Sequence, residues 1–249
     1  MAAITRTTIS PPYLIVAPIL ATIGAFYGKI ILPTDVVGPI AGAVAGVLWA
    51  LLIGVIANRL MRRQSWIALL ANAPVALAII AIGLMTGGGL MYGWMMAAAL
   101  SEPSTTYAVL SALMWPAVPF FITLNSTMEI LLVGLLVFCN WDSDPRRRTL
   151  IILGVATYFV MRVWTYLVFA EARLDIAQHA LSPADVEWFK ATLAMDLRVV
   201  LNLISAICLV LAALLPRRFP PSTVNGQMET LAPPAHRCQS PHRAPALQP

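Results

Sequence analysis

Charged residues are scarce in this sequence, at 11% of 249 residues, whereas they make up about a quarter of soluble domains. Hydrophobic residues account for 59% of the chain, and its mean hydropathy is +0.81. Its apolar runs reach helical length without the alternation of barrel strands, and a helix satisfies its backbone hydrogen bonds within one segment. We therefore predict an all-α, polytopic transmembrane helical bundle with the lipid bilayer as its main surroundings.

Histidine and cysteine are also few, at three each. No histidine lies in an apolar run, which argues against haem ligation by histidine and against the usual histidine-based metal sites. His236, Cys238 and His242 lie together in a polar tail, but they lack a fourth ligand and a fold around them. The three cysteines, Cys139, Cys208 and Cys238, are an odd number and lack motif spacing, so no disulfide framework is implied. We expect no metal and no cofactor.

The net charge of +5 suggests nucleic-acid binding only at first sight. Fourteen of the sixteen basic residues are arginine, and most stand in short clusters where apolar runs end, as topology signals do. A basic face for phosphate binding would need a soluble domain to carry it, and the sequence contains none. We therefore exclude a nucleic-acid partner.

Six apolar segments approach the roughly 20 residues that a helix needs to cross a bilayer. Residues 1–12 form a polar N-terminus, and the predicted spans are residues 13–32, 40–58, 66–85, 120–140, 149–171 and 196–215. A signal peptide is the alternative for the first segment. We favour an uncleaved span because the apolar core is long and has no small-x-small cleavage site.

Residues 87–119 are predicted to form a short re-entrant or interfacial hairpin. Gly87, Gly88 and Gly89 are expected to break the helix, and residues 90–100 and 107–115 are apolar but too short to span. Such a hairpin is tolerated at membrane depth only where protein covers its backbone.

Two further segments are predicted outside the membrane. Residues 172–195 should form a helical hairpin that protrudes beyond the bilayer, with Ser182, Pro183 and Asp185 as a helix start. Residues 217–249 are rich in Pro, Ser, Gln, His and Arg and should be disordered.

The arginines predict the orientation. Six spans with both termini in the cytoplasm place nine basic residues on one side and most acidic residues on the other. The nine are Arg6, Arg59, Arg62, Arg63, Arg146, Arg147, Arg148, Arg217 and Arg218. This asymmetry favours an integral protein of the plasma (inner) membrane.

Small residues recur every fourth position in the second span, at Gly38, Gly42 and Gly46. This spacing lets two helix backbones approach closely. We predict a packing face; a homo-oligomer or a protein partner at this face, or at the protruding hairpin, is the alternative.

Polar residues interrupt the last three spans at one level. By helical rise, Glu129, Arg162 and Asn202 lie roughly 18–21 Å from the expected cytoplasmic ends of their helices. An isolated charge near the bilayer centre costs about 2.5–3.5 kcal/mol, which a Glu–Arg pair facing inward would offset. The predicted polar cluster comprises Glu129, Arg162, Asn202, Arg198, Asn125, Tyr158, Tyr166 and Glu171.

Three functions remain open. The cluster could be an ion pair that only sets helix register, in which case the protein is a non-catalytic membrane subunit or scaffold, which we favour. It could instead be an outward-facing site of a small-molecule carrier or binding protein, with Arg162 and Arg198 holding an anionic or carbonyl-bearing ligand and Glu129 accepting a proton or pairing with a cation. A metal-independent membrane enzyme is the third reading, but no catalytic constellation supports it.

Overall fold

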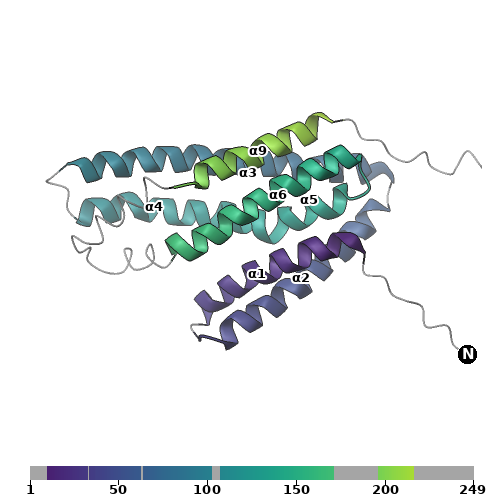
Figure 1. Ribbon diagram of the computed structural model, residues 1–249, viewed down its shortest axis with the longest axis horizontal. Coiled ribbons are helices and arrows are strands. Elements are labelled where there is room, and N and C mark those ends of the chain that lie inside the picture. Colours follow the sequence, from purple (N-terminus) through teal and green to yellow (C-terminus); the bar gives the residue numbers. More distant parts are fainter. Residues whose placement is uncertain (1–9, 33, 63, 103–106, 171–195, 216–249) are drawn as a thin grey trace, which may run out of the picture. The chain divides into compact units, whose positions relative to one another are not determined.

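The computed structural model describes residues 10–32, 34–62, 64–102, 107–170 and 196–215, which form an all-α bundle without strands (Figure 1). Five helical segments are long and apolar enough to cross a membrane, and a sixth apolar helix is shorter. The described helices, of which η1 and η2 are π-helical turns, are α1 Pro11–Ile31, α2 Val37–Met61, α3 Gln64–Ser101, α4 Tyr107–Ser126, η1 Thr127–Leu132, α5 Val133–Asn140, α6 Pro145–Trp164, η2 Thr165–Ala170 and α9 Arg198–Leu214.

Helices α1 and α2 form a tight antiparallel hairpin because glycines meet along their contact. A Cβ atom on Gly42 would lie 1.9 Å from the carbonyl oxygen of Gly24, and one on Gly28 would lie 2.0 Å from that of Gly38. Gly46 faces α1 in the same way. The glycine stripe of α2 is therefore packed against α1 of the same chain, where no larger residue fits.

Helix α3 runs without interruption through Gly87, Gly88 and Gly89, so the expected helix break is wrong. Each glycine costs about 1 kcal/mol in a helix relative to alanine. A broken helix in lipid would instead leave backbone groups unsatisfied, at several kcal/mol each. The 38 residues of α3 span about 57 Å.

Residues 87–119 are accordingly no separate hairpin. They comprise the last turns of α3, the connection to α4 and the first turns of α4, which contains Pro116 and Pro119. Helix α4 then continues through η1 into α5, so Tyr107–Asn140 forms a single helical rod.

The two π-helical turns stand out in this architecture. One, η1, interrupts the rod between α4 and α5, and the other, η2, follows α6. π-Helical turns are rare in proteins, and those that occur are often located at functional sites. Here η1 contains Glu129 and η2 contains Tyr166, two residues of the predicted cluster.

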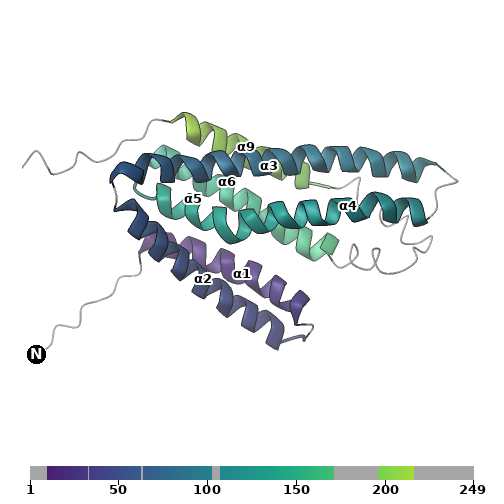
Figure 2. The ribbon, with the colours of Figure 1, turned by 180° about the vertical axis from the view of Figure 1, so that it is seen from behind.

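Helix α9 packs along α3 and α6, and the α1–α2 hairpin lies on the other side of α5 and η1 (Figures 1 and 2). The hydroxyl of Ser205 on α9 donates to the carbonyl oxygen of Gly154 on α6, at 2.8 Å. On the side of α1, the ring of Phe26 stacks on that of Tyr166 with centroids 4.6 Å apart. Ile82, Leu136 and Leu209 are among the fully buried core residues of the bundle.

Arg147, counted above as a topology signal at a helix end, is a buried structural residue. Its side chain is 1% exposed and donates five hydrogen bonds, as many as a guanidinium has N–H groups. The acceptors are Asn140 Oδ1 at 3.1 Å, Ala212 O at 2.9 Å, Leu215 O at 3.4 Å, Ala71 O at 3.4 Å and Asn72 Oδ1 at 3.3 Å. Arg147 therefore joins α3, α5, α6 and the C-terminal end of α9, whose last carbonyls lack helical partners.

Several predicted segments lie outside the described residues. These are the protruding hairpin at residues 172–195, the tail at residues 217–249, most of the N-terminal segment and Glu171.

Candidate functional site

The centre of the candidate site is a buried ion pair between Glu129 and Arg162. Glu129 is fully buried and Arg162 is 6% exposed. Arg162 Nε donates a hydrogen bond to Glu129 Oε1, joining η1 to α6. The pair offsets much of the cost of placing either charge in an apolar bundle.

Two tyrosine hydroxyls complete the surroundings of the Glu129 carboxylate. Tyr27 on α1 donates to Oε2 at 2.8 Å, and Tyr166 on η2 lies 3.1 Å from the same oxygen. Tyr27 Oη also lies 3.1 Å from Ser126 Oγ. With Arg162, three donors from three elements hold the carboxylate, so Glu129 has little capacity left for a further donor.

The guanidinium of Arg162 is only partly used by the protein. Its Cζ atom stacks 4.6 Å from the centroid of the Tyr166 ring, and its Nε is bound to Glu129. Its Nη1 and Nη2 atoms donate to none of the described residues. Arg162 also lines a cavity, so these N–H groups are available to a molecule inside it.

This cavity has a volume of about 120 Å³ and lies between α3, α4, α6 and α9. Its walls are mostly apolar, and we call it the polar cavity for the polar side chains that line it, among them Arg162, Asn125 and Asn202. Asn202 on α9 lines it, and its Oδ1 atom is buried with no hydrogen-bond partner among the described residues. Buried polar atoms without a partner are rare, and leaving one unsatisfied costs about 1–3 kcal/mol. Asn125 lines the cavity from α4, where its Oδ1 accepts from Tyr158 Oη at 3.3 Å.

A second ion pair stands where α9 begins. Arg198 Nε donates to Asp196 Oδ1 at 2.7 Å, and Arg198 Nη2 contacts the other carboxylate oxygen. Both residues line the polar cavity. Arg198 therefore enters the site together with an acidic partner, which neutralises its charge.

Glycines on α3 leave room for the polar cavity. Gly89 and Gly93 line it, and a Cβ atom built on either would have no atom within 4 Å. Gly83 and Gly87, on the same helix, have equally open surroundings but do not line the cavity. Larger side chains at Gly89 or Gly93 would project into the cavity, whereas the other two positions provide matched controls.

A larger, apolar groove lies on the Glu129 side of the ion pair. Its volume is about 430 Å³, and it runs between the α1–α2 hairpin and η1. Trp49 Nε1 donates to the carbonyl oxygen of Ile130 at 2.6 Å beside it. The groove has almost no polar lining, so the hydrogen-bonding capacity of the site lies on the Arg162 side.

The described residues contain no group of three or more His, Cys, Asp or Glu side chains that could hold a metal ion. No protein-family model, curated protein or solved structure matches the chain. Function is therefore inferred from the geometry of the site.

Most of the predicted cluster comes together. Seven of its eight residues lie around the ion pair or the polar cavity, and Glu171 lies outside the described residues. The seven are Glu129, Arg162, Tyr166, Asn125, Tyr158, Asn202 and Arg198, the last beside Asp196.

Sequence reasoning missed Tyr27, Asp196 and the cavity-lining glycines Gly89 and Gly93. Tyr27 could have been noticed as a hydroxyl near the end of an apolar span, and Asp196 as an acid two residues before Arg198. Gly89 was visible in the sequence, but it was interpreted as part of a helix break, and Gly93 was given no role.

Proposed function

We propose that this protein binds a small polar solute in the cavity beside Arg162 and carries it across the membrane. One observation carries the proposal. The amide of Asn202 is buried without a partner, next to an arginine whose outer N–H groups are also unused. A purely structural cluster would satisfy its polar groups internally, since each unsatisfied one is destabilising.

The surroundings of Glu129 favour binding over acid–base chemistry. The Glu129 carboxylate already accepts hydrogen bonds from an arginine and two tyrosines, so its oxygens have little capacity left to contact a reacting group. Glu129 is better suited to hold the Arg162 guanidinium in place. The membrane-enzyme reading therefore receives no support from this carboxylate.

The test combines filling the cavity with a matched control. Gly93→Leu should abolish solute-induced stabilisation in detergent and solute flux in proteoliposomes, because the new side chain occupies the cavity. Gly83→Leu, on the same helix but away from the cavity, should leave both intact. Unchanged binding and flux in a folded Gly93→Leu variant would refute the proposal.

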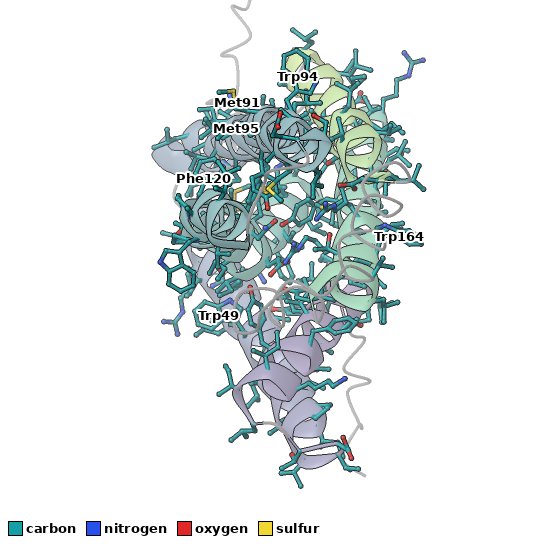
Figure 3. The ribbon with its side chains drawn as sticks, turned by 90° about the vertical axis from the view of Figure 1, so that its left-hand side faces the viewer. Trp49, Met91, Trp94, Met95, Phe120 and Trp164 are labelled. Atoms are coloured by element: carbon teal, nitrogen blue, oxygen red, sulfur yellow. The ribbon has the colours of Figure 1, made fainter. Side chains whose placement is uncertain are left out.

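A non-catalytic subunit is the second candidate function, and the length of α3 favours it. A helix of about 57 Å exceeds the roughly 30 Å of a bilayer core. Met91 and Trp94 on α3 project outward from the bundle, with Trp94 80% exposed (Figure 3). Apolar side chains beyond the lipid would call for a partner to cover them.

Cysteine accessibility separates these two functions. In a subunit, Trp94→Cys should react with a membrane-impermeant maleimide when the purified chain is reconstituted alone, and the reaction should fall when its partner is present. In a carrier that tilts within the bilayer, the same cysteine should stay unreactive throughout.

We also propose that both termini lie in the cytoplasm. The support is the arginine distribution, with Arg62 exposed at the end of α2 and Asp35 exposed between α1 and α2. In intact cells an impermeant maleimide should label Asp35→Cys and spare Arg62→Cys. Labelling of Arg62→Cys but not of Asp35→Cys would contradict the proposal and place both termini outside the cytoplasm.

A further inference from the structure

The charges on the described walls of the polar cavity cancel. Arg162 is paired with Glu129, and Arg198 is paired with Asp196. A free anion entering this cavity would find no uncompensated positive charge on the described walls, yet it would lose its hydration. Burying an ion without a counter-charge costs several kcal/mol, whereas a neutral group needs only hydrogen-bond partners.

The unused hydrogen-bonding groups include donors and an acceptor. Arg162 Nη1 and Nη2 donate to no described residue. Neither does Asn125 Nδ2, since the Asn125 amide is bonded to Tyr158 through its oxygen. Asn202 contributes an amide with one donor end and one acceptor end, the latter unpartnered.

A solute that satisfies these groups needs a carbonyl oxygen for the arginine and N–H groups for the Asn202 oxygen. The cavity of about 120 Å³ has room for a molecule of several non-hydrogen atoms. Drug-sized ligands occupy about 300–1,000 Å³.

We infer that the ligand is a small neutral solute with a carboxamide or urea group, whose carbonyl oxygen accepts from Arg162 and whose N–H donates to Asn202. This inference rests on the proposed function. It narrows the expected ligand from an anionic or carbonyl-bearing molecule to a neutral carbonyl compound that also donates hydrogen bonds. Asn125 would supply a further donor to the same oxygen.

The experiment uses the full chain in mild detergent and four probes of similar size, namely acetamide, urea, acetate and methylammonium at matched millimolar concentrations. Acetamide and urea should raise the thermal unfolding midpoint, by roughly 3–6 °C at a concentration tenfold above the dissociation constant. Acetate and methylammonium should leave the midpoint unchanged.

Two variants tie the effect to the cavity. Asn202→Leu and Gly93→Leu should lose the rise with acetamide, and Gly83→Leu should keep it. Because Asn202→Leu removes an unpartnered amide, its own midpoint should not fall, so a lost response is not explained by misfolding.

The outcomes distinguish the inference from the function on which it rests. A midpoint raised by acetate or methylammonium alone, and lost in Gly93→Leu, would overturn the neutral-solute inference while supporting a binding cavity. No rise with any of the four probes would overturn both. A rise with acetamide that persists in Asn202→Leu and Gly93→Leu would place binding elsewhere and refute the assignment.

Discussion

Two buried arginines on α6, fifteen residues or about 22 Å of helix apart, have opposite surroundings. Arg147 uses all five of its N–H groups on oxygen atoms of the protein. Arg162 donates to the described residues only through Nε, and it lines a cavity. Burial alone therefore does not separate a structural arginine from a functional one, whereas the count of satisfied donors does.

The largest effect is expected at the saturated arginine. Arg147→Met removes five hydrogen bonds and leaves buried carbonyl oxygens without donors, so it should lower the free energy of unfolding by about 3–5 kcal/mol. Unfolding in mixed micelles measures this. Arg146→Met, at the neighbouring exposed position, is the control and should change little. Equal effects of the two variants would show that the Arg147 network contributes nothing to stability.

The second prediction concerns the ion pair at the unsaturated arginine. Glu129→Gln leaves the Arg162 charge without its counter-ion and should destabilise the protein by about 3–5 kcal/mol. Arg162→Met should destabilise it as well, and the double variant should be less destabilised than the sum, with a coupling of about 0.5–3 kcal/mol. Strict additivity in this cycle would reject a direct interaction.

A smaller effect is expected from the hydroxyl that reaches the pair from α1. Tyr27→Phe removes one hydrogen bond to a carboxylate and should lower stability by about 1.5–3 kcal/mol. The ring of Tyr13 packs against that of Phe138 with centroids 4.7 Å apart. Tyr13→Phe keeps that ring contact and should leave the stability nearly unchanged. If the two variants have the same thermal unfolding midpoint, the Tyr27 hydroxyl does not stabilise the contact between α1 and Glu129.

The smallest effect sharpens the comparison, since it involves one asparagine beside each arginine. Asn140→Leu removes the acceptor of Arg147 Nε and should lower the free energy of unfolding by about 1–3 kcal/mol. Asn202→Leu removes an amide that bonds to nothing described, so stability should stay equal or rise. A stability loss in Asn202→Leu matching that in Asn140→Leu would mean that Asn202 has a structural role.

The comparison also explains which parts of the site were predictable. Glu129, Arg162 and Asn202 could be grouped because charge and depth are both readable along a helix, at 1.5 Å per residue. The role of Arg147 could not be predicted from the sequence, because an arginine cluster at the start of a helix is also typical of a topology signal. Apart from Asn140, seven residues away on α5, its acceptors lie on α3 and at the end of α9, at least 65 residues away in sequence.

Residues 87–119 show the limit of local signals. Three consecutive glycines and two prolines argue for interruptions by their intrinsic propensity. The helices nevertheless continue through them. In an apolar environment the backbone has no alternative hydrogen-bond partner, and this outweighs the propensity of single residues.

The sequence by itself determined the class of this protein, the approximate extents of most of its helices and the common level of its intramembrane polar residues. These follow from the length of the apolar runs, the positions of the charges and the helical rise per residue, all of which depend only on the linear sequence. Only the tertiary structure decided that α3 is continuous, that Tyr27 joins Glu129 and that Arg162 and Asn202 border an open cavity. Each of these depends on which distant segments pack together, because a donor is satisfied or left free by its neighbours in space.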